Sequence, residues 1–136
     1  VMTGQIGFEV KMEQSYDEAV KLVTDALKIE GFGVLTEIDV KATLKKKLDV
    51  NFRPYVILGA CNPPLAHQAL SNQPEVGMML PCNVTVEASQ DGGSIVRILD
   101  PKIMMGVGMF SENSALSKVA EQAYEKLARV ASSLRS

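Results

Sequence analysis

The sequence has 136 residues, 46% of them hydrophobic, so it is long and apolar enough for a single domain over residues 1–136 without disulfides or a structural metal. The net charge of −2 gives no electrostatic reason to expect nucleic acid or an anionic membrane as a partner, and no segment reads as a signal peptide or membrane span. Two cysteines are too few for a disulfide-rich secreted scaffold. We therefore expect a cytoplasmic protein whose thiols are free, metal-bound or redox-active.

The chain begins with a predicted strand and a long helix. Residues 5–12 alternate between apolar and polar side chains, which is the period of a strand with one wet face. Ser15 and Glu18 fit a capping box at the start of a helix. An apolar stripe with helical spacing then runs as far as Gly31, a residue type that commonly ends a helix.

A second strand and a short helix are predicted next. Residues 33–38 are rich in β-branched side chains, and Asp39 can cap a helix that ends near Leu48. We expect the lysines at 45–47 to form a solvated face. The alternative is that Lys47 contacts a phosphate group.

The stretch from Tyr55 to Asn83 contains both cysteines and the only histidine. Its first six residues form an apolar run typical of a buried strand, which ends next to Cys61. Asn62 can cap a two-turn helix, with Pro63 at the first helical position, where a missing amide costs nothing. A fourth strand is predicted at 83–88.

The remainder predicts a hairpin, a loop and a long helix. An Asp-Gly-Gly turn at 91–93 indicates that residues 94–99 return antiparallel beside the fourth strand. Residues 100–113 are apolar but punctuated by glycine, and we expect a methionine-rich loop that covers a pocket or meets a partner. From Ser114, an apolar stripe predicts a helix of about five turns.

This order of elements predicts an α+β domain. We expect a mainly antiparallel sheet of about five strands, with two long helices on one face and two short helices between strands. No predicted element covers the other face of the sheet. We therefore expect a homodimer.

The two thiols are the main candidates for chemistry. Cys61 immediately precedes the helix capped by Asn62, so we expect the helix N-terminus to lower the thiol pKa from about 8.5. The alternative is a small buried cysteine that packs as an apolar residue. Cys82 lies on the next predicted strand, and sequential strands are usually neighbours, so the thiols can meet and a reversible disulfide is sterically possible.

A metal site is predicted around the same stretch. Cys61, Cys82 and His67, with a methionine thioether from Met78 or Met79, would suit Cu(I), or zinc if a carboxylate or water completes the set. The alternative for His67 is a partly exposed helix residue. Motifs of hydrolases, nucleotide-binding loops and zinc proteases are absent from the sequence, so no catalytic residue is assigned.

The segments ILGACNPPLAHQAL, GMMLPCNVTVE and TEIDVKATLKKKL, with the aspartate-proline pair at 100–101, resemble domain-of-unknown-function family 302 over nearly the whole chain. The resemblance implies a TATA-binding-protein-like fold, arranged β-α-β4-α, and a homodimer, without a settled activity. It marks eight site positions: Asp39, Lys47, Cys61, Asn62, Pro63, Pro81, Cys82 and Asp100.

Together these patterns predict a thiol-based redox or soft-metal (copper or zinc) binding domain centred on Cys61 and Cys82. The alternative is non-enzymatic: a dimeric interaction module, or a domain that holds a small anion at the helix N-terminus of Asn62 with help from Lys47. A third possibility is that the cysteines only fill the core.

Overall fold

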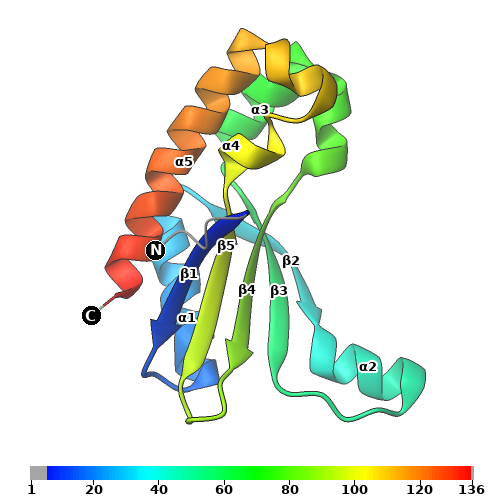
Figure 1. The fold of residues 1–136 in the computed structure, drawn as a ribbon, viewed down its shortest axis with the longest axis vertical. Helices are drawn as coiled ribbons and strands as arrows, with labels where there is room; N and C mark the ends of the chain where they lie inside the picture. Colours follow the sequence, from blue (N-terminus) through cyan, green and yellow to red (C-terminus); the bar gives the residue numbers. More distant parts are fainter. Residues whose placement is uncertain (1–5, 136) are drawn as a thin grey trace.

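The computed structural model describes residues 6–135 (Figure 1). Five strands are present: β1 (Gly7–Met12), β2 (Gly33–Asp39), β3 (Tyr55–Cys61), β4 (Cys82–Ala88) and β5 (Ser94–Leu99). The helices are α1 (Tyr16–Ile29), α2 (Val40–Leu48), α3 (Pro63–Asn72), α4 (Pro101–Met104) and α5 (Ser114–Leu134), with 3-10 turns η1 (Pro74–Met79) and η2 (Gly108–Glu112). Gln5, predicted to begin the first strand, lies outside the described residues.

All five strands form one sheet in the order β1-β5-β4-β3-β2, and every neighbouring pair is antiparallel. The predicted hairpin joins β4 to β5. The first strand of the chain therefore lies at one edge of the sheet and the second at the other edge. This arrangement confirms the predicted α+β class.

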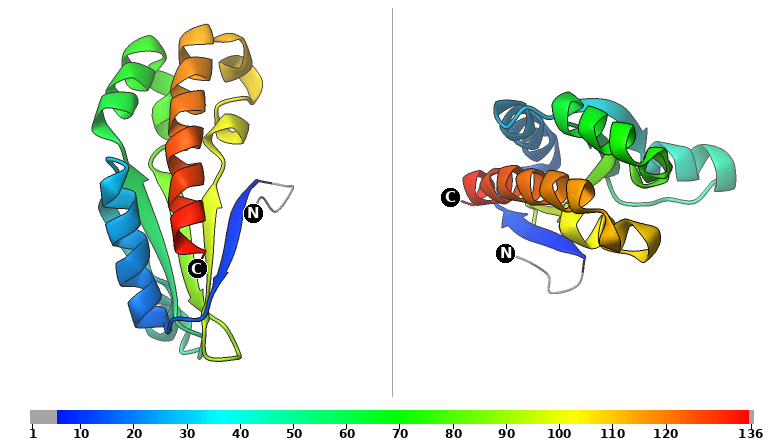
Figure 2. Two further views of the ribbon diagram at one scale, coloured as in Figure 1. Left: turned by 90° about the vertical axis from the view of Figure 1, so that its left-hand side faces the viewer. Right: turned by 90° about the horizontal axis from the view of Figure 1, so that it is seen from above.

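The core lies between one face of the sheet and the two long helices. Both α1 and α5 cover the same face, as Figure 2 shows. Ser15 and Asn113 begin these helices by accepting backbone hydrogen bonds with their side chains. Alternate strand residues point into the core and are buried: Phe8, Val10, Met12, Val56, Leu58, Ala60, Val84, Val86, Val96 and Ile98. Each large apolar side chain of this kind stabilises the fold by about 1.5–3 kcal/mol on burial.

The opposite face of the sheet carries a network of ion pairs. The Arg97 guanidinium donates through Nε to Glu9 at 2.9 Å and through Nη1 to Glu87 at 2.7 Å. The Nε of Arg53 donates to the second oxygen of Glu87 at 2.7 Å. Glu87 is buried beneath these two arginines. Charged and hydrogen-bonded side chains thus cover the centre of the face that has no helix.

Two segments differ from the sequence-based expectation. Residues 100–113 were expected to be a loop, but they contain α4 and η2, because Asp100 caps α4 and Pro101 fits its first position. The turn η1 begins at Pro74, has no side-chain cap, and was not predicted. Among the described residues, no helix combines the length and apolar character needed to cross a membrane.

Candidate functional site

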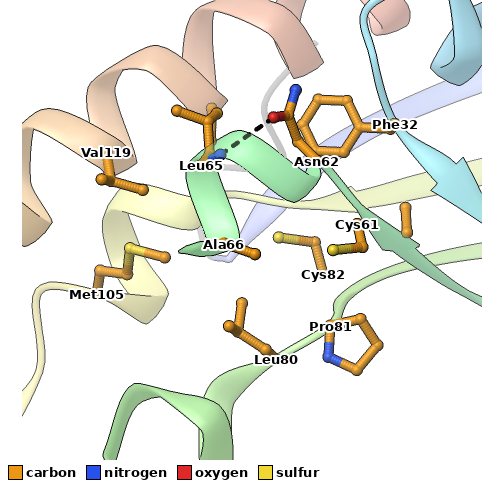
Figure 3. A pocket seen from close by; sticks show the side chains of 12 residues that line it. Phe32, Cys61, Asn62, Leu65, Ala66, Leu80, Pro81, Cys82, Met105 and Val119 are labelled. Atoms are coloured by element: carbon orange, nitrogen blue, oxygen red, sulfur yellow. Dashed lines mark hydrogen bonds between the residues drawn. The ribbon is translucent and has the colours of Figure 1, made fainter. Parts of the chain in front are cut away.

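The two cysteines lie at adjoining ends of neighbouring strands. Cys61 is the last residue of β3, Cys82 is the first residue of β4, and Cys82 pairs with Ala60, the residue before Cys61. Both thiols are free. Figure 3 shows that both cysteines line one pocket between α3 and the sheet, which confirms that the fold brings them to one place.

The pocket is small and almost entirely apolar. Its volume is about 30 Å³, the space of roughly one water molecule. Twelve residues line it: Phe32, Ala60, Cys61, Asn62, Leu65, Ala66, Leu80, Pro81, Cys82, Met105, Val119 and Ala123. None of these side chains carries a charge.

Asn62 is the only amide side chain in the lining, and its hydrogen bonds are already made. Its Oδ1 accepts from the Leu65 amide at 3.2 Å, and its Nδ2 donates to the Glu30 carbonyl at 3.4 Å. These bonds fix the start of α3 against the end of α1. Sulfur atoms are therefore the donors that the pocket presents to a ligand, from Cys61, Cys82 and Met105.

The expected lowering of the Cys61 pKa is wrong. Burial raises the pKa of Cys61, and burial together with the neighbouring charge of Cys61 raises the pKa of Cys82 to about 11. The first turn of α3 does not offset this effect of burial, because it has no free amide to offer a thiolate.

Pro63 and Pro64 have no N–H group. The next two amides are used, since Leu65 donates to the Asn62 side chain and Ala66 donates to the Asn62 carbonyl at 2.9 Å. The same geometry argues against the alternative of an anion held by these amides, because anion binding at a helix N-terminus depends on free N–H groups.

The predicted metal ligands are only partly brought together. His67 is exposed on α3 and does not line the pocket. Met78 is 79% exposed on η1, and Met79 is also outside the lining. Within residues 6–135, no group of three or more His, Cys, Asp or Glu side chains could hold a metal ion. The structure instead adds Met105, which sequence reasoning had only placed in a methionine-rich loop.

Two further predicted site residues lie at the far end of the sheet. Asp39 pairs with Val56, five residues before Cys61 along β3, which corresponds to roughly 17 Å at the rise of a strand. Its carboxylate caps α2 by accepting from the Ala42 amide at 2.9 Å. Lys47 lies on the exposed helix that follows. Neither residue lines the pocket.

The last two predicted residues outside the pocket have structural roles. Pro63 occupies the first position of α3 and is exposed. Asp100 is buried, and its Oδ1 accepts from the Lys102 amide at 2.8 Å to cap α4. Pro81, in contrast, lines the pocket beside Cys82. The predicted residues that meet in the pocket are thus Cys61, Asn62, Pro81 and Cys82.

The apolar walls of the pocket could not be assigned to a site from sequence. Phe32 follows α1, and Val119 and Ala123 belong to the stripe of α5. In the sequence these residues carry only the signal of core packing.

A sequence model described as "Domain of unknown function DUF302" matches residues 8–134, nearly the whole chain. The chain belongs to the DUF302 family. This confirms the resemblance drawn from the sequence around the two cysteines.

A solved structure supports this assignment. The DUF302 chain is similar to an uncharacterised conserved DUF302 protein from Bacillus stearothermophilus, known from a crystal structure. The two chains are 29% identical, with a TM-score of 0.84, and the match covers 96% of this chain and 99% of the other. No curated protein matches.

Proposed function

We propose that this DUF302 protein binds one soft, thiophilic metal ion, Cu(I), through the thiolates of Cys61 and Cys82. The supporting observation is that two free thiols from adjoining strand ends share one uncharged pocket. Soft thiolate and thioether ligands select Cu(I), zinc and iron–sulfur clusters among biological metals.

The raised pKa values favour metal binding over thiolate catalysis. A catalytic cysteine needs a lowered pKa or an adjacent base, whereas burial keeps both thiols of this pocket protonated at neutral pH. No lining residue is basic. A thiophilic ion, in contrast, displaces the thiol protons when it binds, so that its affinity increases with pH.

The donor set favours Cu(I) over zinc. Zinc in proteins is usually held by four ligands drawn from Cys, His and carboxylate side chains. The described part of the chain brings only the two cysteines of that type together. Met105 adds a soft thioether in the same pocket. Two thiolates and one thioether match the preference of Cu(I) for few, soft ligands.

The closeness of the thiols also supports a second function, reversible disulfide formation. Cys82 pairs across the sheet with Ala60, the residue before Cys61, and Figure 3 shows the two cysteine side chains next to each other in the pocket. Oxidation would join the two sulfur atoms and release two protons and two electrons to a disulfide-containing acceptor, which would become two thiols. A neutral disulfide would also suit the apolar walls.

The proposed setting is a reducing, cytoplasmic compartment, because reduced thiols persist there. We further propose that the protein acts as a homodimer.

Anaerobic titration with Cu(I) against a chromophoric Cu(I) chelator tests the proposed function. We expect one tightly bound ion per chain, and loss of tight binding in Cys61→Ser and in Cys82→Ser. His67→Ala is the matched control and should bind as well as the parent. Mass spectrometry after exposure to oxidised glutathione tests the disulfide, which lowers the mass by two hydrogens. The proposal fails if the parent takes up no ion, or if the double serine variant binds it equally well.

A further inference from the structure

The two thiols of the pocket differ in their access to solvent. Cys61 is partly exposed, whereas Cys82 is buried, with an exposed fraction of 6%. The difference follows from the strands, because Cys82 pairs with Ala60 on the buried side of the sheet, and Cys61 is the next residue, at the end of β3. A reagent that approaches from solution therefore meets Cys61 first.

The size of the pocket adds to this difference. Its volume of about 30 Å³ holds roughly one water molecule. A tripeptide such as glutathione does not fit in that space beside Cys82. A disulfide from solution can thus reach the Cys82 sulfur only after its glutathionyl group has been attached to Cys61, which lies next to Cys82 in the pocket (Figure 3).

The pocket keeps few donors for a metal ion once the two thiols are joined. The thioether of Met105 remains, and the Asn62 amide already makes two hydrogen bonds. One neutral thioether does not replace two thiolates as ligands of Cu(I). Within residues 6–135, no group of three or more His, Cys, Asp or Glu side chains could take the ion over. Oxidation of the pair would therefore release the metal.

We propose that the cysteine pair is a redox switch for the metal ion, in which Cys61 exchanges with a small disulfide such as oxidised glutathione, Cys82 resolves the mixed disulfide, and the ion leaves. This inference rests on the proposed function. It adds the order in which the two thiols react and the condition under which the ion is released.

The two exchange steps balance in atoms and electrons. In the first step the Cys61 sulfur bonds to one sulfur of oxidised glutathione, and the other glutathione leaves as a thiolate. In the second step the Cys82 sulfur bonds to the Cys61 sulfur, and the second glutathione leaves. The two protein sulfurs lose two electrons, which the glutathione disulfide gains. The leaving thiolates take up two protons, from the protein thiols or, when Cu(I) is bound, from water, and the ion departs as Cu(I).

Metal binding and disulfide formation use the same two sulfur atoms, so each state excludes the other. The effect is reciprocal, because an ion that binds only the reduced protein must also oppose its oxidation. For one ion per chain, each tenfold rise in free Cu(I) above the dissociation constant should raise the ratio of oxidised glutathione to the square of reduced glutathione needed for half oxidation about tenfold.

Mass spectrometry of the single serine variants without metal tests the order of the thiols. After exposure to oxidised glutathione, we expect one glutathionyl group on Cys61 in the Cys82→Ser variant. The folded Cys61→Ser variant should stay unmodified, because Cys82 is buried. The same variant unfolded in urea is the control and should be modified. The parent should lose two hydrogens and keep no adduct, and circular dichroism checks that each variant is folded.

A redox titration of the parent in an anaerobic Cu(I) buffer, set by a chromophoric chelator, tests the switch. The reduced protein should hold one ion per chain, the oxidised protein none, and reduction by dithiothreitol should restore binding. The glutathione ratio at half oxidation should follow the tenfold rule given above. His67→Ala, at an exposed position outside the pocket, is the matched control and should switch as the parent does.

Three results would overturn the switch while the proposed metal site survives. One is modification of folded Cys61→Ser as fast as that of Cys82→Ser. The second is an oxidised parent that still holds the ion, and the third is a half-oxidation ratio that does not move with free Cu(I). A reduced parent that takes up no Cu(I) would instead overturn the proposed function, and the switch with it.

Discussion

Cys61 and Cys82 are coupled across the adjoining ends of β3 and β4. Burial is the first cause of the raised pKa of Cys82, and the charge of Cys61 is the second. Burial raises the pKa of both thiols in this apolar pocket, so they are poor nucleophiles at neutral pH. They remain good ligands for an ion that replaces their protons.

Alkylation by iodoacetamide should be slow for both thiols at neutral pH. The reaction uses the thiolate, and the pKa of Cys82 is raised to about 11, so its rate should still be rising above pH 9. The rate for each cysteine is measured by mass spectrometry from pH 6 to 11. Protein unfolded in urea is the control, with ordinary thiol reactivity. A native cysteine whose rate levels off below pH 8 would contradict the raised pKa.

The same shift predicts a loss of stability at high pH. Between about pH 9 and 11 the unfolded Cys82 thiol ionises while the folded thiol keeps its proton, so unfolding releases a proton and is favoured as pH rises. The contribution of Cys82 is fully present below pH 9 and falls by about 2 kcal/mol across this range. Urea unfolding of Cys82→Ala should show a shallower decline than the parent. If the free energy of unfolding of the parent and of Cys82→Ala fell equally between pH 9 and 11, the raised pKa of Cys82 would have no effect on stability.

Asn62 should matter for stability as the cap of α3. Asn62→Ala removes the acceptor for the Leu65 amide and the donor to the Glu30 carbonyl. We expect a loss of about 1–2 kcal/mol in the free energy of unfolding. Asn62→Asp keeps the acceptor and should lose less, although its carboxylate would raise the pKa of the nearby thiols further. Equal losses in the two variants would show that the cap is not the cause.

Gly59 should not tolerate a side chain, whereas Gly33 should. A Cβ at Gly59 would clash with Thr36 Oγ1 and lie 2.7 Å from Cγ of Pro81, which lines the pocket. A Cβ at Gly33 would meet nothing within 4 Å. We expect Gly59→Ala to lose about 1–3 kcal/mol in urea unfolding and Gly33→Ala to stay close to the parent. Similar stability of both variants would contradict the packing described here.

Glu87 should stabilise the fold in its ionised form. Burial opposes its charge, but hydrogen bonds from Arg97 and Arg53 lower its pKa overall. Glu87→Gln should lose about 1–3 kcal/mol at pH 7, a modest value because both arginines are partly exposed.

The lowered pKa sets the pH range of this effect. The contribution of Glu87 is present above the ordinary glutamate pKa and is lost as pH falls through the lowered value, so Glu87→Gln should decline less steeply in acid than the parent. Glu112→Gln, at an exposed position without an ion pair within the described residues, is the control. If Glu87→Gln and Glu112→Gln had the same stability at every pH, the ion pairs of Glu87 with Arg53 and Arg97 would not stabilise the fold.

Much of the fold was predictable because local patterns and tertiary packing agree. The alternation in β1 and the caps at Ser15 and Asn62 predicted elements that the structure contains. The meeting of Cys61 with Cys82 followed from the tendency of sequential strands to pair.

The details of the candidate site depend on tertiary structure, which the identity of a single residue does not reveal. The pKa of Cys61 is raised by burial in the pocket, and Pro64, a second proline, removes an amide of the first turn of α3 that could have opposed the shift. His67 has the right chemistry but faces solvent. Met105 was one of several methionines in the chain, and only the path of the segment after α4 places it at the thiols.

X-ray absorption spectroscopy of the Cu(I)-loaded protein tests the central claim most directly. We predict a first coordination shell made only of sulfur, with two thiolates in the Met105→Leu variant and no bound copper in the Cys61→Ser/Cys82→Ser variant. A first shell that contains nitrogen or oxygen, or one that the loss of both cysteines leaves unchanged, would contradict the proposal that Cys61 and Cys82 form the binding site.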